Sequence, residues 1–396
     1  MPLPTPFHPR TSALCTSYRW KEWAGYHAVC SYGGHHDPEY HAIRQTAGLL
    51  DITPLVKLHV HGRDATEFMA WMTARDTRRL KVGQVGYGCF CDGAGKVLDD
   101  GTVTRLDDSS YRVTSADPGW GWMMRNAEGF DVRIDEVTDD IAALALQGPK
   151  ARDILVDVMG GDIGDLGFFR HAHGAVAGAP IEVTRTGYTG DLGYELWMAN
   201  EHALHVYDAL VEAGLPHGIH PLGLDALDVS RVEAGFILMG VDYFSARHAL
   251  VPAQMSSPYE IGLGWTVHLK NHDFLGRAAL AEEKAKGSPW AMVGLVADWE
   301  EIEELFDAEG LPPSLPAGAW RSPIPVYLDD GRQVGQATSG AWSPMLKQNL
   351  ALATVKSAHA APGTRLRLEL TVEFRRRTVG AVVTETPFFD PERKRS

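Results

Sequence analysis

The stretch Thr186-Gly187-Tyr188-Thr189-Gly190-Asp191-Leu192-Gly193-Tyr194-Glu195 lies between two apolar segments of alternating pattern. Those segments, residues 181–185 and 194–198, predict an antiparallel strand pair joined by a glycine-rich turn. Three glycines within seven residues let the backbone approach another group closely. Glu195 leaves the turn on an apolar strand, so its carboxylate either faces inward and requires a partner, or faces water.

Outward from this turn, strands and helices follow one another irregularly. Residues 56–62 predict a half-buried strand, and residues 84–90 with 97–105 predict a hairpin. Asp64 is expected to cap a helix that ends near Ala74. Further predicted elements are a strand at 142–146 and helices at 151–159, 202–213 and 223–235. Since no regular βαβ alternation exists, the predicted fold class is α+β rather than a doubly wound sheet.

The C-terminal part of the chain has a different pattern from the rest. Its short apolar strands predict a small β-barrel, with strands at 290–296, 325–328, 333–338, 351–355, 365–370 and 377–383. A polar stretch with a proline at 284–289 precedes them and indicates a boundary. We therefore predict two regions, residues 1–285 and residues 290–390.

Composition and charge restrict the classes of partner. The 396 residues are 44% hydrophobic and 22% charged, which is typical of a globular protein with a large core. Lys and Arg number 37 against 51 Asp and Glu, and the net charge of −14 disfavours nucleic acid and anionic membranes as partners. No apolar run approaches the ~18 residues of a membrane helix, and the first residues do not resemble a secretory signal. We expect a cytoplasmic protein without a membrane partner.

Several common functional motifs are absent, and neither cysteine nor histidine spacing indicates a metal. The chain has no dinucleotide-binding G-x-G-x-x-G after a strand, no P-loop, no H-E-x-x-H and no G-x-S-x-G. His171 and His173 could be paired ligands, but no neighbouring carboxylate or thiol cluster is evident, so no metal is predicted. Buried free thiols are expected for the cysteines, which are Cys15, Cys30, Cys89 and Cys91.

Two further features allow alternative interpretations. The first forty residues are rich in aromatic and histidine side chains, Trp23 and Tyr32 among them, which either line a pocket or form a packed N-terminal wrap. Asp76 directly follows an apolar helix. Its carboxylate is either partly desolvated and useful as an acid or acceptor, or bonded to its own turn.

Taken in order along the chain, a set of short motifs resembles the folate-dependent aminomethyltransferase family, which includes the T-protein of the glycine cleavage system. No single motif is specific, but together they span almost the whole chain in the family's order. The motifs are Arg44 to Asp51, Arg75-Asp76-Thr77, Gly95 to Asp100, Leu144 to Pro149, Thr186 to Glu195, Arg231 to Gly235, Gly262 to Trp265 with Asp273 to Arg277, and Thr338 to Pro344.

The resemblance implies a discontinuous folate-binding region of two interleaved α+β subdomains around a central hole, closed by the C-terminal β-barrel. Tetrahydrofolate would occupy that hole. By the same resemblance, Asp76 matches the family's catalytic Asp, and Glu195 matches the carboxylate that holds the pterin. Tyr188 matches the aromatic beside that carboxylate, and Tyr87 falls where the family often has a pocket-lining Tyr.

The chain departs from the T-protein pattern where function is decided. Leu227 stands in place of an Arg that contacts folate, and Arg231, one helical turn later, either substitutes for it or forms a structural salt bridge. Arg75 replaces the usual Asn, where it either binds a substrate carboxylate or is solvated. With Trp23 and Tyr32 at an aromatic entrance, Arg75 would suit a small anionic methyl donor.

We therefore predict a tetrahydrofolate-dependent methyltransferase, or demethylase, acting on a small O-, S- or N-methyl donor. The alternative is the aminomethyltransferase of the glycine cleavage system, which would require a lipoyl carrier protein as partner. A third hypothesis is a non-enzymatic folate-binding factor for iron–sulfur proteins. That class carries a K-G-C-[FY]-x-G-Q signature, and the segment from Tyr87 to Cys91 lacks its Lys and its Gly-Gln.

Overall fold

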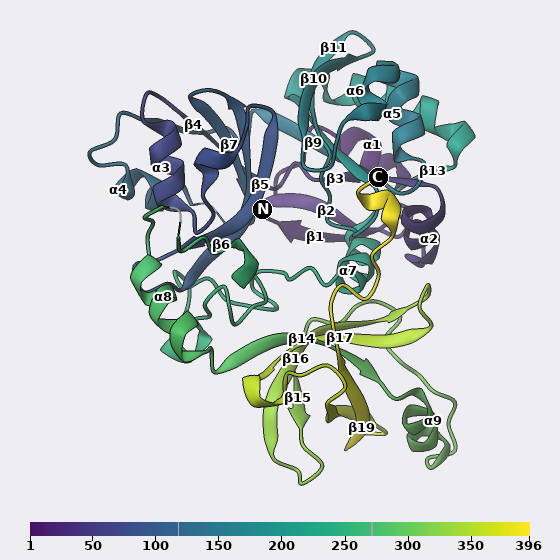
Figure 1. Cartoon of the computed structure of the whole chain (residues 1–396). Helices are drawn as coiled ribbons and strands as arrows, with labels where there is room; N and C mark the ends of the chain where they lie inside the picture. Colours follow the sequence, from purple (N-terminus) through teal and green to yellow (C-terminus); the bar gives the residue numbers. More distant parts are fainter. Residues whose placement is uncertain (118, 271) are drawn as a thin grey trace.

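The computed structural model describes residues 1–117, 119–270 and 272–396. Figure 1 shows three lobes: a five-stranded sheet at upper left, a six-stranded sheet at upper right and a closed barrel below. The chain enters the six-stranded sheet with residues 47–51, forms the five-stranded sheet with residues 56–136, returns to the six-stranded sheet with residues 141–221 and reaches the barrel at residue 290. The α+β architecture and the C-terminal barrel are as predicted.

The six-stranded sheet has the order β10-β11-β12-β9-β3-β13. Its strands are β3 Ala47–Asp51, β9 Ile141–Gln147, β10 His171–Val176, β11 Ala179–Thr184, β12 Gly193–Ala199 and β13 Ile219–Pro221. On one face the helices α5 Ala151–Met159 and α6 Ala203–Gly214 pack over a core that includes Leu144, Leu196 and Val206, all 0% exposed. The predicted strand pair is present, since Glu195 on β12 pairs with Thr184 on β11.

The five-stranded antiparallel sheet has the order β5-β6-β7-β4-β8. Its strands are β4 Val56–His61, β5 Gln84–Cys91, β6 Val97–Asp107, β7 Ser110–Ser115 and β8 Arg133–Glu136. The helices α3 Ala65–Met72 and α4 Trp120–Asn126 cover its apolar face, where Phe68 and Met69 are buried. The 3-10 helix η1 Thr77–Arg79 follows α3 and leads into β5.

The N-terminal hairpin and the helix α7 Leu224–Glu233 lie between the lobes (Figure 1). The helix α1 His8–Leu14 leads to the hairpin of β1 Arg19–Trp23 and β2 Tyr26–Ser31, and α2 Asp37–Gln45 precedes β3. The helix α7 packs against β2, α2 and the barrel strand β16 Gln333–Ser343. A buried ion pair between Arg44 and Glu233, 2.6 Å apart, fastens α2 to α7.

The barrel is closed in the order β14-β17-β16-β15-β18-β19. Its strands are β14 Trp290–Ala297, β15 Ile324–Tyr327, β16 Gln333–Ser343, β17 Gln348–Lys356, β18 Arg365–Val372 and β19 Arg375–Thr384. The helix α9 Trp299–Asp307 covers it, while α8 Arg277–Lys286 and the short η6 Gly264–Thr266 belong to the segment that leads toward it.

One local prediction needs correction. The helix expected to end near Ala74 stops at Met72, and Asp64, its N-cap, makes no side-chain cap bond. Asp64 instead accepts a hydrogen bond from the backbone N–H of Asp131, which ties the start of α3 to the segment before β8. The polar stretch at 284–289 contains the end of α8 at Lys286 and directly precedes β14.

Candidate functional site

Two tyrosines converge on one carboxylate at the β5–β6 hairpin. The hydroxyl of Tyr87 on β5 donates to Oδ2 of Asp100 on β6 at 2.5 Å, and the hydroxyl of Tyr243, which follows α7, donates to Oδ1. Burial raises the pKa of Asp100, and the two phenol hydrogen bonds only partly oppose that shift. A buried carboxylate with a raised pKa is a stronger proton acceptor than an exposed one.

A cation and an exposed indole adjoin this pair. Arg75, between α3 and η1, donates from Nη1 to the carbonyl oxygen of Tyr87 at 3.3 Å. Its guanidinium lies 6.0 Å from the ring centroid of Trp265 on η6, and Trp265 stacks on Tyr87 with centroids 6.1 Å apart. Arg75 is half-buried, whereas Trp265 is 62% exposed. Among the described residues no carboxylate lies within 4.0 Å of Arg75, so this cation is free to pair with an anionic ligand.

The glycine-rich turn between β11 and β12 reaches the same region. The Tyr188 hydroxyl donates to the carbonyl oxygen of Ile237, and its ring stacks on Phe236 at 5.5 Å. Burial raises the pKa of Tyr87 and that of Tyr188. The neighbouring Tyr188 adds to the shift of Tyr87, and the charge of Asp100 adds to the shift of Tyr188. We call Arg75, Tyr87, Asp100, Tyr188, Tyr243 and Trp265 the Tyr87 cluster.

Gly187 and Gly193 of this turn leave room for the side chain of Gln147. A Cβ at Gly187 or Gly193 would collide with the Gln147 side chain, which accepts a 2.8 Å hydrogen bond from the Thr189 hydroxyl. The close backbone approach predicted for these glycines is therefore made to Gln147, at the end of β9. This packing fixes where Thr186 and Tyr188 point.

Glu195 faces inward rather than into water. Its Oε2 accepts hydrogen bonds from the hydroxyls of Thr186 at 2.6 Å and Thr184 at 3.3 Å. Burial raises the pKa of Glu195, and these bonds and the charge of Arg112 oppose that shift. Its other oxygen, Oε1, has no hydrogen bond to any described residue. An inward carboxylate with a spare oxygen can accept N–H donors from a ligand.

The side chain of Arg112 on β7 extends from the five-stranded sheet to the six-stranded sheet. Its Nη1 donates to Oε2 of Glu182 at 2.6 Å, and its guanidinium lies 4.5 Å from the ring centroid of Trp197. The side chain is 3% exposed, yet Nε and Nη2 are buried without a hydrogen-bond partner among the described residues. Unsatisfied buried N–H groups are costly, so they favour an acceptor supplied by a ligand or water.

Asp76 is held by neighbouring arginines. Arg78 donates to both carboxylate oxygens, with Nε 2.9 Å from Oδ1, and Arg79 Nε lies 3.5 Å from Oδ2. The backbone N–H of Asp76 donates to Nδ1 of His268 at 3.3 Å. Burial alone would raise the pKa of Asp76, but the hydrogen bonds from Arg78 and the charges of His272 and Arg78 outweigh it and lower that pKa. Asp76 is therefore ionised and paired.

Arg231 forms a buried salt-bridge network. It donates to Asp228 at 2.7 Å, to Asp242 at 2.6 Å and to Ser339 of the barrel at 3.0 Å. Its Nη2 has no hydrogen-bond partner among the described residues. Leu227 packs into an apolar cluster beside α7. Of the two alternatives for Arg231, the geometry is that of a structural ion pair, with the Nη2 group left without a partner among the described residues.

Most of the N-terminal aromatics are packed, although Tyr18 is 85% exposed, and several of them line a small cavity. Tyr32 is 6% exposed and borders a cavity together with Trp20, His27 and Asp51. Trp23 packs against the apolar cluster around α7. No contact joins Trp23 or Tyr32 to Arg75 in the described part of the chain. The four cysteines are free, as expected, and three are buried.

The structure brings together Arg75, Tyr87 and Tyr188, all from the predicted set. Asp76 is adjacent in sequence but bonded elsewhere, and no contact between described residues joins it to Glu195. Sequence reasoning missed Tyr243, Trp265 and Arg112 and gave Asp100 no role. Asp100 and Trp265 stand within motifs that were recognised, whereas Arg112 carries no local signal.

Comparison with known families accounts for most of the chain. A family profile described as GCVT N-terminal domain matches residues 12–271, and one described as glycine cleavage T-protein C-terminal barrel domain matches residues 315–390. Within the described residues, no helix is both long and apolar enough to span a membrane.

Individual relatives agree with these matches. An aminomethyltransferase of Desulfitobacterium hafniense is 32% identical over 349 residues, covering 87% of this chain and 88% of that protein. A trimethylamine-oxide aldolase of Ruegeria pomeroyi is 34% identical over 371 residues, covering 90% of this chain but 43% of that longer protein. The solved structure of the glycine cleavage system aminomethyltransferase T from Bartonella henselae superposes with a TM-score of 0.82 at 24% identity, over 98% of this chain and 99% of that one. This chain belongs to the glycine cleavage T-protein family, whose enzymes are one-carbon transferases that use tetrahydrofolate.

Proposed function

We propose that the chain moves a methyl group from a small anionic donor to N5 of tetrahydrofolate, which makes it a demethylase. The observation that carries this proposal is Arg75, a half-buried cation with no carboxylate partner among the described residues and with the exposed Trp265 beside it. A planar guanidinium suits a carboxylate or a similar anion, and the indole suits an apolar or aromatic body. Trp23 and Tyr32 remain predictions as substrate contacts.

The donor set near Glu195 fits a reduced pterin. The aminopyrimidine edge of a pterin offers N–H donors beside a carbonyl oxygen. Oε1 of Glu195 would accept from the N–H groups, and the unpartnered N–H groups of Arg112 would satisfy the oxygen. Tyr87 and Tyr188 supply aromatic surface on the neighbouring turn and strand. The cofactor role of Arg231 stays a prediction that its leftover Nη2 permits.

Tetrahydrofolate supplies the nitrogen that accepts the one-carbon unit. The protein residues hold donor and acceptor together, and well-oriented intramolecular reactions gain up to ~7–11 kcal/mol in this way. A carboxyl group near the reacting nitrogen takes up a proton or stabilises developing positive charge.

Two carboxyl groups are candidates for that role. Asp76, assigned from the family resemblance, stays a prediction. Asp100 is favoured by its raised pKa and its hydrogen bonds from Tyr87 and Tyr243, whereas Arg78 and Arg79 hold Asp76 as a weak base. We propose Asp100 as the group that exchanges the proton, and residues 1–285 as the region that contains the whole site, with 290–390 as the closing barrel.

A direct experiment mixes the protein with tetrahydrofolate and a panel of methoxybenzoates, sulfonium acids and methylated amino acids. Chromatography with mass detection then measures 5-methyltetrahydrofolate. The proposal expects that product with at least one anionic donor and none with a neutral analogue of the same shape.

Aminomethyl transfer in glycine cleavage is the second candidate, because most of the similar relatives carry the name aminomethyltransferase at 31–34% identity. It predicts methylene-tetrahydrofolate only when an aminomethylated lipoyl carrier protein is supplied. Arg75 would then contact the carrier or the folate tail rather than a small donor.

A further inference from the structure

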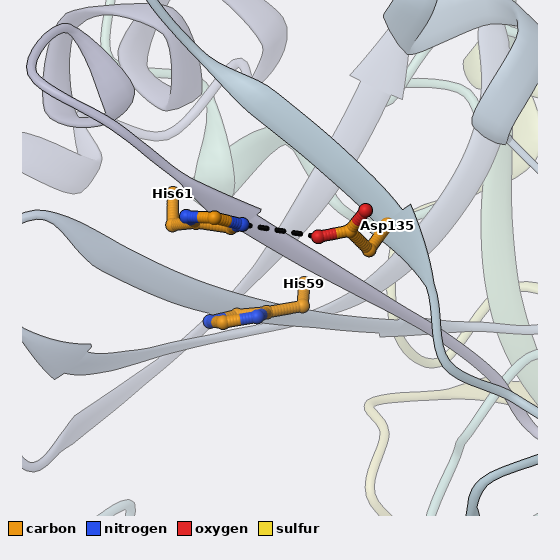
Figure 2. Close-up of side chains that lie close together, drawn as sticks. All are labelled: His59, His61 and Asp135. Atoms are coloured by element: carbon orange, nitrogen blue, oxygen red, sulfur yellow. Dashed lines mark hydrogen bonds and ion pairs between the residues drawn. The ribbon is translucent and has the colours of Figure 1, made fainter.

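Three side chains with metal-binding groups meet on the polar face of the five-stranded sheet. His59 and His61 lie two residues apart on β4, so both point to the same face. Asp135 on the neighbouring strand β8 stands directly opposite His59 in the ladder. Figure 2 shows the two imidazoles one above the other, with the Asp135 carboxylate beside them.

The distances suit a single ion. Nε2 of His61 lies 3.0 Å from Oδ2 of Asp135, and the imidazole centroids are 4.7 Å apart at an interplanar angle of 22°. One ligand atom from each residue lies within 4.8 Å of the others. Bonds of about 2.0–2.2 Å from zinc to His nitrogen and carboxylate oxygen place ligand atoms some ~3.4 Å apart, which small side-chain rotations reach. We propose that His59, His61 and Asp135 bind a divalent first-row transition-metal ion, with zinc as the probe.

The surroundings support this set of ligands. Ser110 Oγ is 2.7 Å from Nε2 of His59, which fixes that ring and leaves Nδ1 for the ion. Arg133 holds the other oxygen of Asp135 at 2.8 Å but is itself 74% exposed, so water weakens its repulsion of a cation. The side chains of His61 and Asp135 are 36% and 32% exposed, so water has access to the remaining coordination position.

A second cluster, again of two histidines and one carboxylate, is less suitable for a metal ion. His171, His173 and Glu182 also lie within reach of one another, and the expectation that no carboxylate accompanies these histidines is wrong. However, Oε2 of Glu182 already accepts from Arg112 at 2.6 Å and from His171 at 2.9 Å. A cation there would displace a buried guanidinium from its partner, which is costly.

A metal ion at this site would stabilise the edge of the five-stranded sheet. The short strand β8 is the edge of the sheet and pairs with β4 in the described ladder. Edge strands are the first elements to open. An ion bound by residues of both strands would link β8 to β4 and slow the opening of β8.

The test uses the full chain, stripped with a chelator, desalted, and titrated with zinc sulfate at pH 7.5 by calorimetry. We expect one equivalent of bound zinc, and the variants H61Q and D135N each weaken binding at least ~10-fold. The matched control, H173Q in the second cluster, retains it. Hydrogen–deuterium exchange should show zinc-dependent protection of residues 133–136 in the wild type and in H173Q, but in neither site variant.

Melting curves without metal establish that the variants fold, and both substituted side chains are partly exposed. The proposal is overturned if wild type binds no more zinc than H61Q, if H173Q removes the bound equivalent, or if zinc binds without protecting β8.

Discussion

The guanidinium of Arg75 lies 6.0 Å from the ring centroid of Trp265, and both adjoin Tyr87. Arg75 comes from the end of the α3 segment, and Trp265 from η6, far along the chain. Burial lowers the pKa of Arg75, but a guanidinium remains charged at any physiological pH. The fold therefore presents a permanent cation and an aromatic surface at one position.

Removal of this cation should weaken the binding of an anionic donor. A charge-assisted hydrogen bond contributes about 1.5–3 kcal/mol, so Arg75→Gln should raise KM for the donor ~10- to 100-fold with a smaller change in kcat. Steady-state kinetics at saturating tetrahydrofolate measures this. The control Arg63→Gln alters an arginine whose side chain is 76% exposed and should leave KM unchanged. Equal KM values for Arg75→Gln and wild type would contradict the anionic-donor proposal.

The choice between the two carboxylates can be made by paired substitutions. Asp100→Asn should lower kcat ~10²- to 10⁴-fold while folate affinity changes only a few-fold, because a general acid–base contributes about that much. Asp76→Asn should alter mainly thermal stability, since it breaks the pairs with Arg78 and Arg79. Single-turnover rates and folate titrations separate the two effects. The reverse pattern, with turnover lost only in Asp76→Asn, would restore the assignment made from the sequence.

Glu195 should act in binding rather than in chemistry. Replacement by Gln removes the charge while keeping the shape, so we expect the Kd for tetrahydrofolate to rise at least ~10-fold, with kcat at saturation little changed. Glu201→Gln is the control, because its side chain is 79% exposed on the segment that follows the same strand. A folate Kd that does not move in Glu195→Gln would remove the pterin contact from the account.

The ion pair between Arg112 and Glu182 links the two sheets, and it predicts that the stability of the fold decreases in acid. Burial alone would raise the pKa of Glu182, but the bond from His171 and the charge of Arg112 outweigh it and lower that pKa to about 2. A pKa depressed in the folded state stabilises the protein above the ordinary pKa of about 4.3, and this stabilisation is lost as pH falls toward 2.

Denaturant unfolding of wild type and Glu182→Gln should therefore differ most above pH 5, by up to about 3 kcal/mol. The difference should shrink as the pH falls toward 2, because an increasing share of the Glu182 carboxyl groups in the folded wild type is then protonated. A difference that stays constant from pH 6 to pH 2.5 would show that the charge of Glu182 does not carry this link.

Local patterns in the sequence predicted most of the fold. Apolar alternation located β4, β5 and β12, and the glycine-rich stretch after Arg185 marked the turn, because strand periodicity and turn chemistry are local. The start of α3 after Asp64 agrees with the prediction, but the capping bond does not, since the Asp64 carboxylate bonds to Asp131 rather than to its own helix. A cap residue has several possible partners, and tertiary structure selects among them.

The site was predicted only in part, because its remaining contacts are long-range. Tyr243 and Asp100 are separated by 143 positions, and His61 and Asp135 by 74. Arg112 stands on a strand, and its place there does not reveal its partner Glu182. No periodicity reports such pairs, so they appear only once strands are paired and distant segments of the chain pack together.

The identity of the folate product distinguishes methyl transfer from aminomethyl transfer. Protein and tetrahydrofolate are incubated with isotope-labelled anionic methyl donors in one series and with aminomethylated lipoyl carrier protein in another. We predict labelled 5-methyltetrahydrofolate in the first series, formed more slowly by Arg75→Gln and ~10²- to 10⁴-fold more slowly by Asp100→Asn. Methylene-tetrahydrofolate formed solely in the second series, with no methyl transfer from any small donor, would contradict it.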